Sequence, residues 1–464
     1  AGPSSFIDFA AVFVVFAHGI VGRADLPIPT ELFGVAAAAA LVASFLALAA
    51  GWSRPRLEHV RERALVGLPR VVDVVLGLIG VIAFAASAWA GIAGTDVQAD
   101  NLAPTAVFVA FWVGVPFLTL IFGDVWRLLS PWRAIGRGVG WLMRRLSGDA
   151  MPEPLPYPER VGTWPAVAGL IGFAICELCW ATAREPRPLG IIMLAYFAVQ
   201  LVGMSLYGVE AWTRRADAFG VWFSLLARLA PIGRRADGRL VLRPPVVGAA
   251  SLVAVAGTAA MLISAIGTTG FDGAKEGPLF NDLAGTLQDF FVSLGTTKGL
   301  GLELAFVIGL FLAIALIGAV WLGGMEGMPR TKLGLDRGGL SRQFAHTLIP
   351  IAAGYLVAHY FSLLAYNGQD LWRLASDPLG NGHDYLGGAQ SSIDYAVVSA
   401  TAIWYVQVGA LVAGHIAGLV LAHDRALVIY GDARSATRSQ IVMLVLMVCF
   451  TLLGLWLLSA ALNT

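Results

Sequence analysis

The chain alternates between long apolar segments and shorter polar loops. Ten segments of about 20 mostly apolar residues recur along it, and this length matches the hydrocarbon core of a bilayer. Helices satisfy their backbone hydrogen bonds internally, as lipid requires. The segments are 32–50, 71–92, 104–122, 164–182, 189–212, 246–266, 301–322, 344–365, 395–421 and 441–462. The pattern predicts an all-α, polytopic transmembrane helical bundle, a single membrane-embedded domain over 1–464 with five spans within 32–212 and five within 246–462.

The segment 1–17 has two interpretations. Its apolar part, 6–17, is shorter than a comfortable span. Val15, Phe16 and Ala17 precede His18 in the manner of a small-residue signal-peptidase site. The segment is therefore either a short eleventh helix that starts in the cytoplasm or a signal-like segment. The bundle accordingly has 10–11 spans.

Three other stretches have apolar stripes at helical spacing, which is typical of helices that lie in the membrane interface. The first carries its stripe at Trp132, Ile135, Val139, Leu142 and Leu146, with arginines away from it. The second is 219–229. The third repeats at Phe280, Leu283, Leu287, Phe290, Phe291 and Leu294. For the third, a lid over a site or a dock for a partner is the alternative.

Composition agrees with a membrane protein and excludes several other classes. The chain is 58% hydrophobic and 13% charged, unlike an ordinary soluble globule. A net charge of +1 offers no basis for a nucleic-acid partner. All three cysteines (Cys176, Cys179 and Cys449) lie in apolar segments, which excludes a secreted disulfide framework.

The basic residues give the bundle a predicted orientation. Of the 31 Lys and Arg residues, 25 lie in alternate loops and six in the loops between them. The basic loops are 51–70, 123–163, 213–244, 323–343 and 423–439. Cytoplasmic loops are enriched in Lys and Arg. We therefore expect a multi-pass protein of a bacterial cytoplasmic (inner) membrane, with the basic loops in the cytoplasm and the C-terminus outside.

Polar side chains deep in a bilayer are costly, and so they indicate candidate sites. At about 1.5 Å of rise per residue, His359 lies about 24 Å above the cytoplasmic face. Tyr405 and Gln407, on the next span, lie at a similar depth. Glu177 lies in the outer half of its own span, beside Cys176. These groups predict an outward-facing polar pocket.

The outer mouth adds His18, Arg23, Asp25 and His383 to the candidates. A set of His, Asp and Glu has the composition of a divalent metal site or of an acid–base site. His18, Asp25, His359 and His383 are the predicted ligands of a divalent transition metal, zinc or copper. No HExxH motif and no second Cys-x-x-Cys supports it. A haem is not expected, since the thirteen residues between His346 and His359 turn the two rings by about 220°.

Three strings together resemble a known membrane family: HGIVGRADLPIP at 18–29, HTLIPIAAGYLVAHYFSLL at 346–364 and WYVQVGALVAGHIAGLVLAHDRAL at 404–427. They are similar to a polytopic family, common in actinobacteria, named fenitrothion hydrolase. The similarity extends from His18 almost to the C-terminus. It implies hydrolysis of an organophosphate triester, and it assigns no catalytic residues.

Three functions stay open. The first is a metal-assisted membrane hydrolase of an apolar ester or organophosphate. A metal held by some of the four predicted ligands, His359 among them, polarises the ester and lowers the pKa of a bound water, Tyr405 and Gln407 orient the substrate, and Arg23 stabilises developing charge. The second is a proton-coupled transporter or channel in which Glu177 titrates. A partial repeat between 122–137 and 219–234, with seven identities in sixteen, favours it. The third is a membrane subunit of a larger respiratory or metal-handling complex, with protein partners as well as the lipid bilayer.

Overall fold

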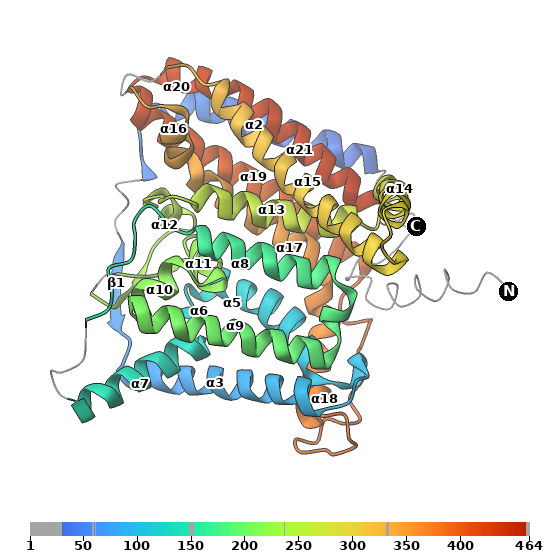
Figure 1. The fold of residues 1–464 in the computed structure, drawn as a ribbon. Helices are drawn as coiled ribbons and strands as arrows, with labels where there is room; N and C mark the ends of the chain where they lie inside the picture. Colours follow the sequence, from blue (N-terminus) through green and yellow to red (C-terminus); the bar gives the residue numbers. More distant parts are fainter. Residues whose placement is uncertain are drawn as a thin grey trace.

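The protein is a bundle of helices that lie side by side across the view of Figure 1. The computed structural model describes residues 30–57, 60, 62–147, 153–235, 237–330 and 334–460. Its longer helices are α2 (Thr30–Gly51), α3 (Arg70–Ala93), α7 (Pro131–Ser147), α9 (Pro186–Tyr207), α13 (Thr258–Ala274), α14 (Pro278–Ser293), α15 (Lys298–Glu326), α17 (Leu348–Asn367), α19 (Ala400–Tyr430) and α21 (Ile441–Ala460). The molecule is 74% helical, which confirms the predicted all-α bundle.

Shorter elements complete the described chain. Two rods change their winding along their length: α4 (Leu102–Thr105), the π-helix η3 (Ala106–Gly114) and α5 (Val115–Phe122) form one, and α8 (Trp164–Ala174) and the π-helix η5 (Ile175–Cys179) form the other. The short helices are η2 (Gln98–Asp100), α6 (Trp126–Leu129), η6 (Ala181–Arg184), α10 (Val209–Arg215), α11 (Ala218–Leu226), α12 (Val247–Ala250), α16 (Arg337–Phe344), η7 (Ala345–Thr347), η8 (Gly368–Asp370), α18 (Leu371–Ser376) and α20 (Ala433–Ser439).

Eight helices in the described residues are long and apolar enough to cross a membrane, and the rod 164–179 is a shorter apolar helix. The protein is therefore a multi-pass integral membrane protein with lipid around it. One predicted span is misplaced. The prediction was 246–266, but α13 starts at Thr258 and ends at Ala274. Hydropathy carries no information about backbone angles, and Val246 and Gly257 adopt positive φ angles of 74° and 85°. It also does not indicate that Asp272, a charged residue later in the helix, is buried by its partners.

The stretch 219–229 is not a surface helix. Its residues form most of α11, where Phe219, Trp222 and Phe223 are all at most 5% exposed. The stretch therefore belongs to the core. The repeat that pairs it with 122–137 is not a structural repeat, because 135–137 is helical, in α7, whereas the aligned residues 232–234 form a strand. The predicted helices at 132–146 and 280–294 do form, as α7 and α14.

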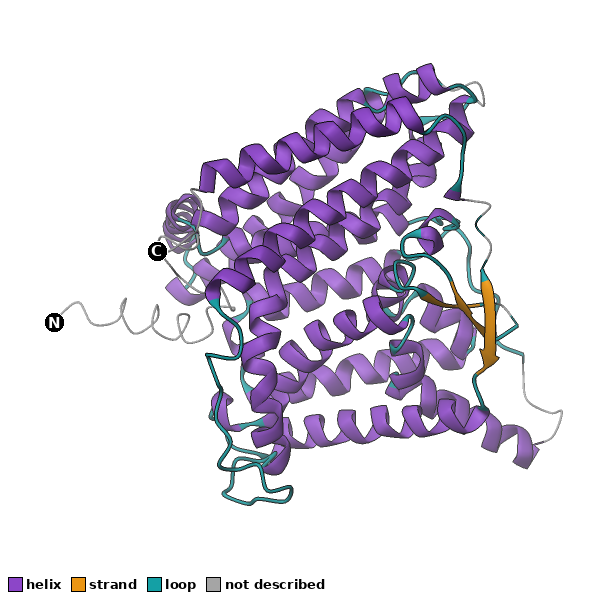
Figure 2. Ribbon diagram, turned by 180° about the vertical axis from the view of Figure 1, so that it is seen from behind, coloured by secondary structure: helices purple, strands orange, loops and turns teal. Residues whose placement is uncertain are grey.

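The two ends of the bundle differ in structure. We call the end that carries α7, α16 and α20 the basic end, because it holds the arginine-rich loops. A small antiparallel sheet lies there, with β1 (Arg63–Gly67) and β2 (Ile232–Arg234) on either side of β3 (Arg239–Leu242) (Figure 2). The opposite end carries α14 and α18.

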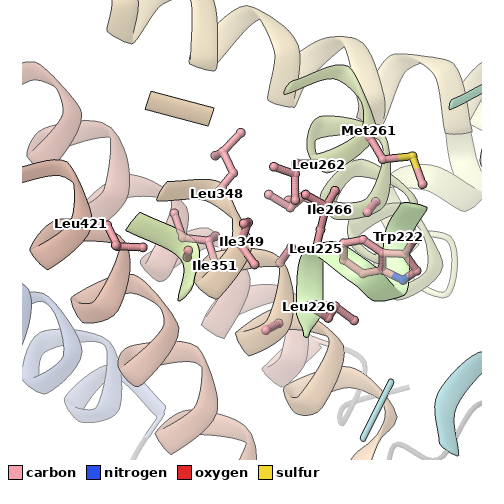
Figure 3. Packing of buried hydrophobic residues seen from close by; sticks show 14 of the residues in the cluster. Trp222, Leu225, Leu226, Met261, Leu262, Ile266, Leu348, Ile349, Ile351 and Leu421 are labelled. Atoms are coloured by element: carbon pink, nitrogen blue, oxygen red, sulfur yellow. The ribbon is translucent and has the colours of Figure 1, made fainter. Parts of the chain in front are cut away.

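The centre of the core is the crossing of α17 with its neighbours. Residues of α11, α13 and α17 meet there, among them Trp222, Leu262 and Ile349 (Figure 3). Helices α17 and α19 approach closely because glycines face each other. A Cβ on Gly354 would lie 2.7 Å from the Ala410 carbonyl oxygen, and one on Gly414 would lie 2.5 Å from that of Pro350. Small residues at a helix–helix contact allow this close approach of the two backbones.

Candidate functional site

A chain of ionisable side chains is buried between α13 and α17. Asp272 Oδ2 lies 2.9 Å from His359 Nε2 and accepts a hydrogen bond of 3.0 Å from the Tyr360 hydroxyl. Asp272 Oδ1 pairs with the Lys275 ammonium at 3.0 Å. The Asp272 and Lys275 side chains are 0% and 2% exposed, so water does not screen this ion pair. One carboxylate is thus shared by an imidazole, a phenol and an ammonium.

Helix geometry places this cluster at one depth in the bundle. Asp272 comes fourteen residues after the start of α13, or about 21 Å along the axis, and His359 lies about 17 Å from the start of α17. Both helices start at the basic end (Figure 1). The cluster therefore lies nearer to the opposite end. The distance of about 17 Å for His359 is shorter than the predicted distance of about 24 Å, because α17 starts at Leu348 and the predicted span starts at 344.

Both π-helices contribute a residue to this region. Trp112, in η3, donates its indole N–H to the Tyr360 oxygen at 3.5 Å. Glu177, in η5, is 2% exposed and interacts electrostatically with Asp272 and Lys275. Its Oε2 atom has no hydrogen-bond partner among the described residues. Single π turns within helices are frequent at functional sites, because the extra residue redirects side chains.

The cluster continues to the surface at the opposite end. Lys275 Nζ lies 3.9 Å from Glu276 Oε1, and the Glu276 side chain is 42% exposed. Arg184, in η6, interacts with Glu177, Asp272 and Glu276. Burial raises the pKa of Glu276, Asp272 adds to this effect, and Lys275 and Arg184 oppose it. An unbroken series of charged groups therefore connects the surface with Asp272.

The structure brings together two predicted site residues, His359 and Glu177. The residues that join them (Asp272, Lys275 and Tyr360) were not among the predicted ones. The signal for two of them was present: Asp272 and Lys275 stand three residues apart beside an apolar segment, the spacing of a helical ion pair. The predicted span 246–266 ends before both residues and so puts them in a loop. Charged residues are common in loops, so neither residue stands out there.

The other predicted site residues lie apart from this cluster or outside the described chain. Tyr405 is 51% exposed, and its ring contacts Phe33 of α2. Gln407 is buried on α19. His383 is exposed in the loop after α18, where its ring packs against Tyr385.

His18, Arg23 and Asp25 lie outside the described residues. Within the described ranges, no group of three or more His, Cys, Asp or Glu residues could hold a metal ion. The zinc or copper site that includes His18 and Asp25 therefore stays a prediction.

A second buried histidine–aspartate site lies at the basic end of α19. Asp424 accepts hydrogen bonds from the Trp52 indole and from the backbone N–H groups of Arg56 and Leu57, at 3.1, 2.6 and 3.3 Å. His423 Nε2 lies 2.9 Å from the Trp52 carbonyl oxygen, and His423 Nδ1 is 3.3 Å from the Gln440 amide nitrogen. These contacts attach the chain after α2 to α19. We therefore interpret the pair as structural.

A small apolar cavity lies on the basic side of the ionisable cluster. Its volume is about 60 Å³, and Ile266, Tyr355, His415 and Phe450 are among its lining residues. His415 Nδ1 lies 2.8 Å from the Leu411 carbonyl oxygen of its own helix. This agrees with a packing role for His415 beside Gly414.

Comparison of the chain with protein-family models, with curated proteins and with solved structures found no match. The resemblance to the fenitrothion hydrolase family stays a prediction. The long apolar helices define a multi-pass integral membrane protein, and its most unusual feature is the buried cluster around Asp272.

Proposed function

We propose that this protein moves protons across the membrane, as a proton-coupled transporter or a channel, and that Asp272 and His359 are its proton-binding centre. One observation carries the proposal: Asp272 is fully buried, and it contacts the side chains of Lys275, His359 and Tyr360, each of which can carry a proton. Ionisable residues inside a membrane bundle are costly, and proton relays are a common reason for their presence.

The geometry links protonation to helix packing. Asp272 is on α13, whereas His359 and Tyr360 are on α17, so the carboxylate bonds one helix to the other. A proton on Asp272 removes the negative charge that pairs with Lys275, and it occupies an oxygen that otherwise accepts hydrogen bonds. The α13–α17 contact then weakens. Such a contact is a two-state element that proton binding can bias.

The charge asymmetry supports an orientation for this transport. If the basic end faces the cytoplasm, as the positive-inside rule indicates, Asp272 lies in the outer half of the bundle. Protons would then reach the cluster from outside a bacterial inner membrane. The direction of the pH gradient across such a membrane favours inward movement.

The test is a proton-evoked current. The purified protein is reconstituted into liposomes on a solid-supported membrane, and a rapid step to acidic pH is applied. We expect a charge displacement that protein-free liposomes lack and that falls about tenfold or more in Asp272→Asn and His359→Gln, because the amide side chains of Asn and Gln do not take up a proton in this pH range. The matched control is Asp282→Asn, an exposed carboxylate on α14.

Two results would contradict the proposal. One is a wild-type current no larger than that of protein-free liposomes, with insertion verified by protease protection. The other is a full current in folded Asp272→Asn and His359→Gln proteins.

A further inference from the structure

Glu276 is at the outer end of the series Glu276–Lys275–Asp272. Among the side chains of the ionisable cluster described above, it alone is substantially exposed. We infer that Glu276 is the proton acceptor at the surface, that Lys275 passes the proton inward, and that protons reach Asp272 from the end opposite to the basic end. The inference rests on the proposed function, because it assigns the access route of the same site.

Exposure falls stepwise along this series. The side chains of Glu276, Lys275 and Asp272 are 42%, 2% and 0% exposed. The distances between their charged atoms are 3.9 Å for Glu276 to Lys275 and 3.0 Å for Lys275 to Asp272. The longer step lies at the surface, where rotation of the half-exposed Glu276 side chain can close it. The shorter step lies inside, where the groups cannot easily move.

The basic side of the cluster is closed by apolar side chains. Leu262 on α13 and Ile349 on α17 each lie ten residues, or about 15 Å, nearer to the basic end than Asp272 and His359. Trp222 of α11 packs in the same region (Figure 3). All three are at most 2% exposed. A proton on Asp272 therefore faces a packed apolar layer on one side and charged groups on the other.

The transfer conserves protons and charge. Glu276 takes a proton from water and becomes a neutral carboxylic acid. Lys275 gives one ammonium proton to Asp272 Oδ1, and Glu276 returns one proton to the Lys275 nitrogen. At the end Glu276 is a carboxylate again, Lys275 is an ammonium again, and Asp272 holds the proton.

The charges around Glu276 suit this role. Lys275 and Asp272 face it from α13, Arg184 from η6 and His359 from α17. The two cations, Lys275 and Arg184, lie close to three carboxyl groups, those of Glu276, Asp272 and Glu177, so the cluster has no excess of positive charge. An arriving proton is therefore not strongly repelled. When a proton leaves, the negative charge that remains still has cations beside it.

The first experiment measures sidedness by cysteine labelling. In a background with Cys176, Cys179 and Cys449 replaced by alanine, Glu276→Cys is treated with a membrane-impermeant methanethiosulfonate in right-side-out and inside-out vesicles. Asp282→Cys on α14 reports the same end, and Arg144→Cys on α7 reports the basic end. We expect Glu276→Cys to label from the same side as Asp282→Cys. Labelling from the side of Arg144→Cys would overturn the inference.

The second experiment measures the current after a pH step. We expect Glu276→Gln to lower it several-fold, Glu276→Asp to restore most of it, and Asp282→Asn to leave it unchanged. A wild-type current with an unchanged Glu276→Gln current would refute the access route and leave the proposed function intact. Absence of the wild-type current refutes the proposed function itself. Because Glu276 is half-exposed, its variants are expected to fold, and gel filtration verifies this.

Discussion

Among the described residues, two buried histidine–aspartate sites have carboxylates with different kinds of partner. Asp424 receives its hydrogen bonds from an indole and from backbone N–H groups, none of which can lose or gain a proton near neutral pH. Asp272 receives its contacts from an imidazole, a phenol and an ammonium. Equal burial therefore does not mean equal chemistry. The ionisation of the donors distinguishes a structural carboxylate from one that can exchange protons.

The positions of the two sites agree with this difference. Asp424 joins the chain after α2 to the basic end of α19, where hydrogen bonds to backbone hold a connection in place. Asp272 joins the last turn of α13 to the middle of α17, where a change of charge alters the packing of the two helices.

Asp272→Asn should have the largest effect on stability. It leaves the Lys275 ammonium buried without its carboxylate, and breaking such a pair costs about 3–5 kcal/mol. The double variant Asp272→Asn with Lys275→Met should recover much of this loss without recovering the pH-evoked current. Thermal unfolding in detergent and the current assay measure the two effects. A double variant that regains the current would show that Asp272 is structural, like Asp424.

Asp424→Asn should have a smaller effect, and only on stability. The amide keeps one acceptor oxygen, but its NH₂ group faces N–H donors, so we expect a loss of about 1–3 kcal/mol. The current per folded molecule should equal that of the wild type. A fully stable Asp424→Asn protein without current would contradict the prediction. It would mean that Asp424, and not Asp272, belongs to the proton-exchanging site.

The two histidines offer a matched pair of substitutions. Glutamine keeps a hydrogen-bond donor at either position but cannot carry the proton, so each change should cost only about 1 kcal/mol of stability. His359→Gln should nevertheless lower the current, and His423→Gln should not. Equal currents in the two variants would remove the functional distinction.

The pH dependence should shift rather than disappear when Glu276 is replaced. Burial raises the pKa of Glu276, with Lys275, Asp272, Arg184 and His359 around it, so its carboxyl takes up protons at a higher pH than an exposed glutamate. The wild-type current should rise as the pH falls through this raised pKa. Glu276→Gln should lack that part of the rise. A pH profile that is the same in both proteins would contradict the prediction.

Metal removal should have the smallest effect. Proton transfer through Asp272, Lys275 and His359 requires no metal, so treatment with a chelator should leave the current unchanged. Elemental analysis of the purified protein checks the same point. Stoichiometric zinc or copper whose removal abolishes function would instead support the metal-assisted hydrolase and its predicted ligands, His18 and Asp25 among them.

The outcome for individual residues shows where sequence reasoning succeeds. His359 and Glu177 were found because a polar residue inside a long apolar segment stands out against its neighbours. Asp272 and Lys275 were missed because α13 is short and begins later than the apolar pattern suggests. Tyr405 shares the predicted depth of His359, but depth along a helix does not indicate which face a side chain occupies.

Segment length and hydrophobicity are enough to predict a multi-pass helical membrane protein, because both respond to the bilayer, which acts on every residue in the same way. Its arginine pattern likewise separated one end of the bundle from the other. Which buried charges meet depends instead on the tertiary fold. Asp272 and His359 are 87 residues apart in the chain, and their contact depends on how α13 and α17 are rotated and packed. That arrangement follows from the combined packing of many side chains, which no local pattern records.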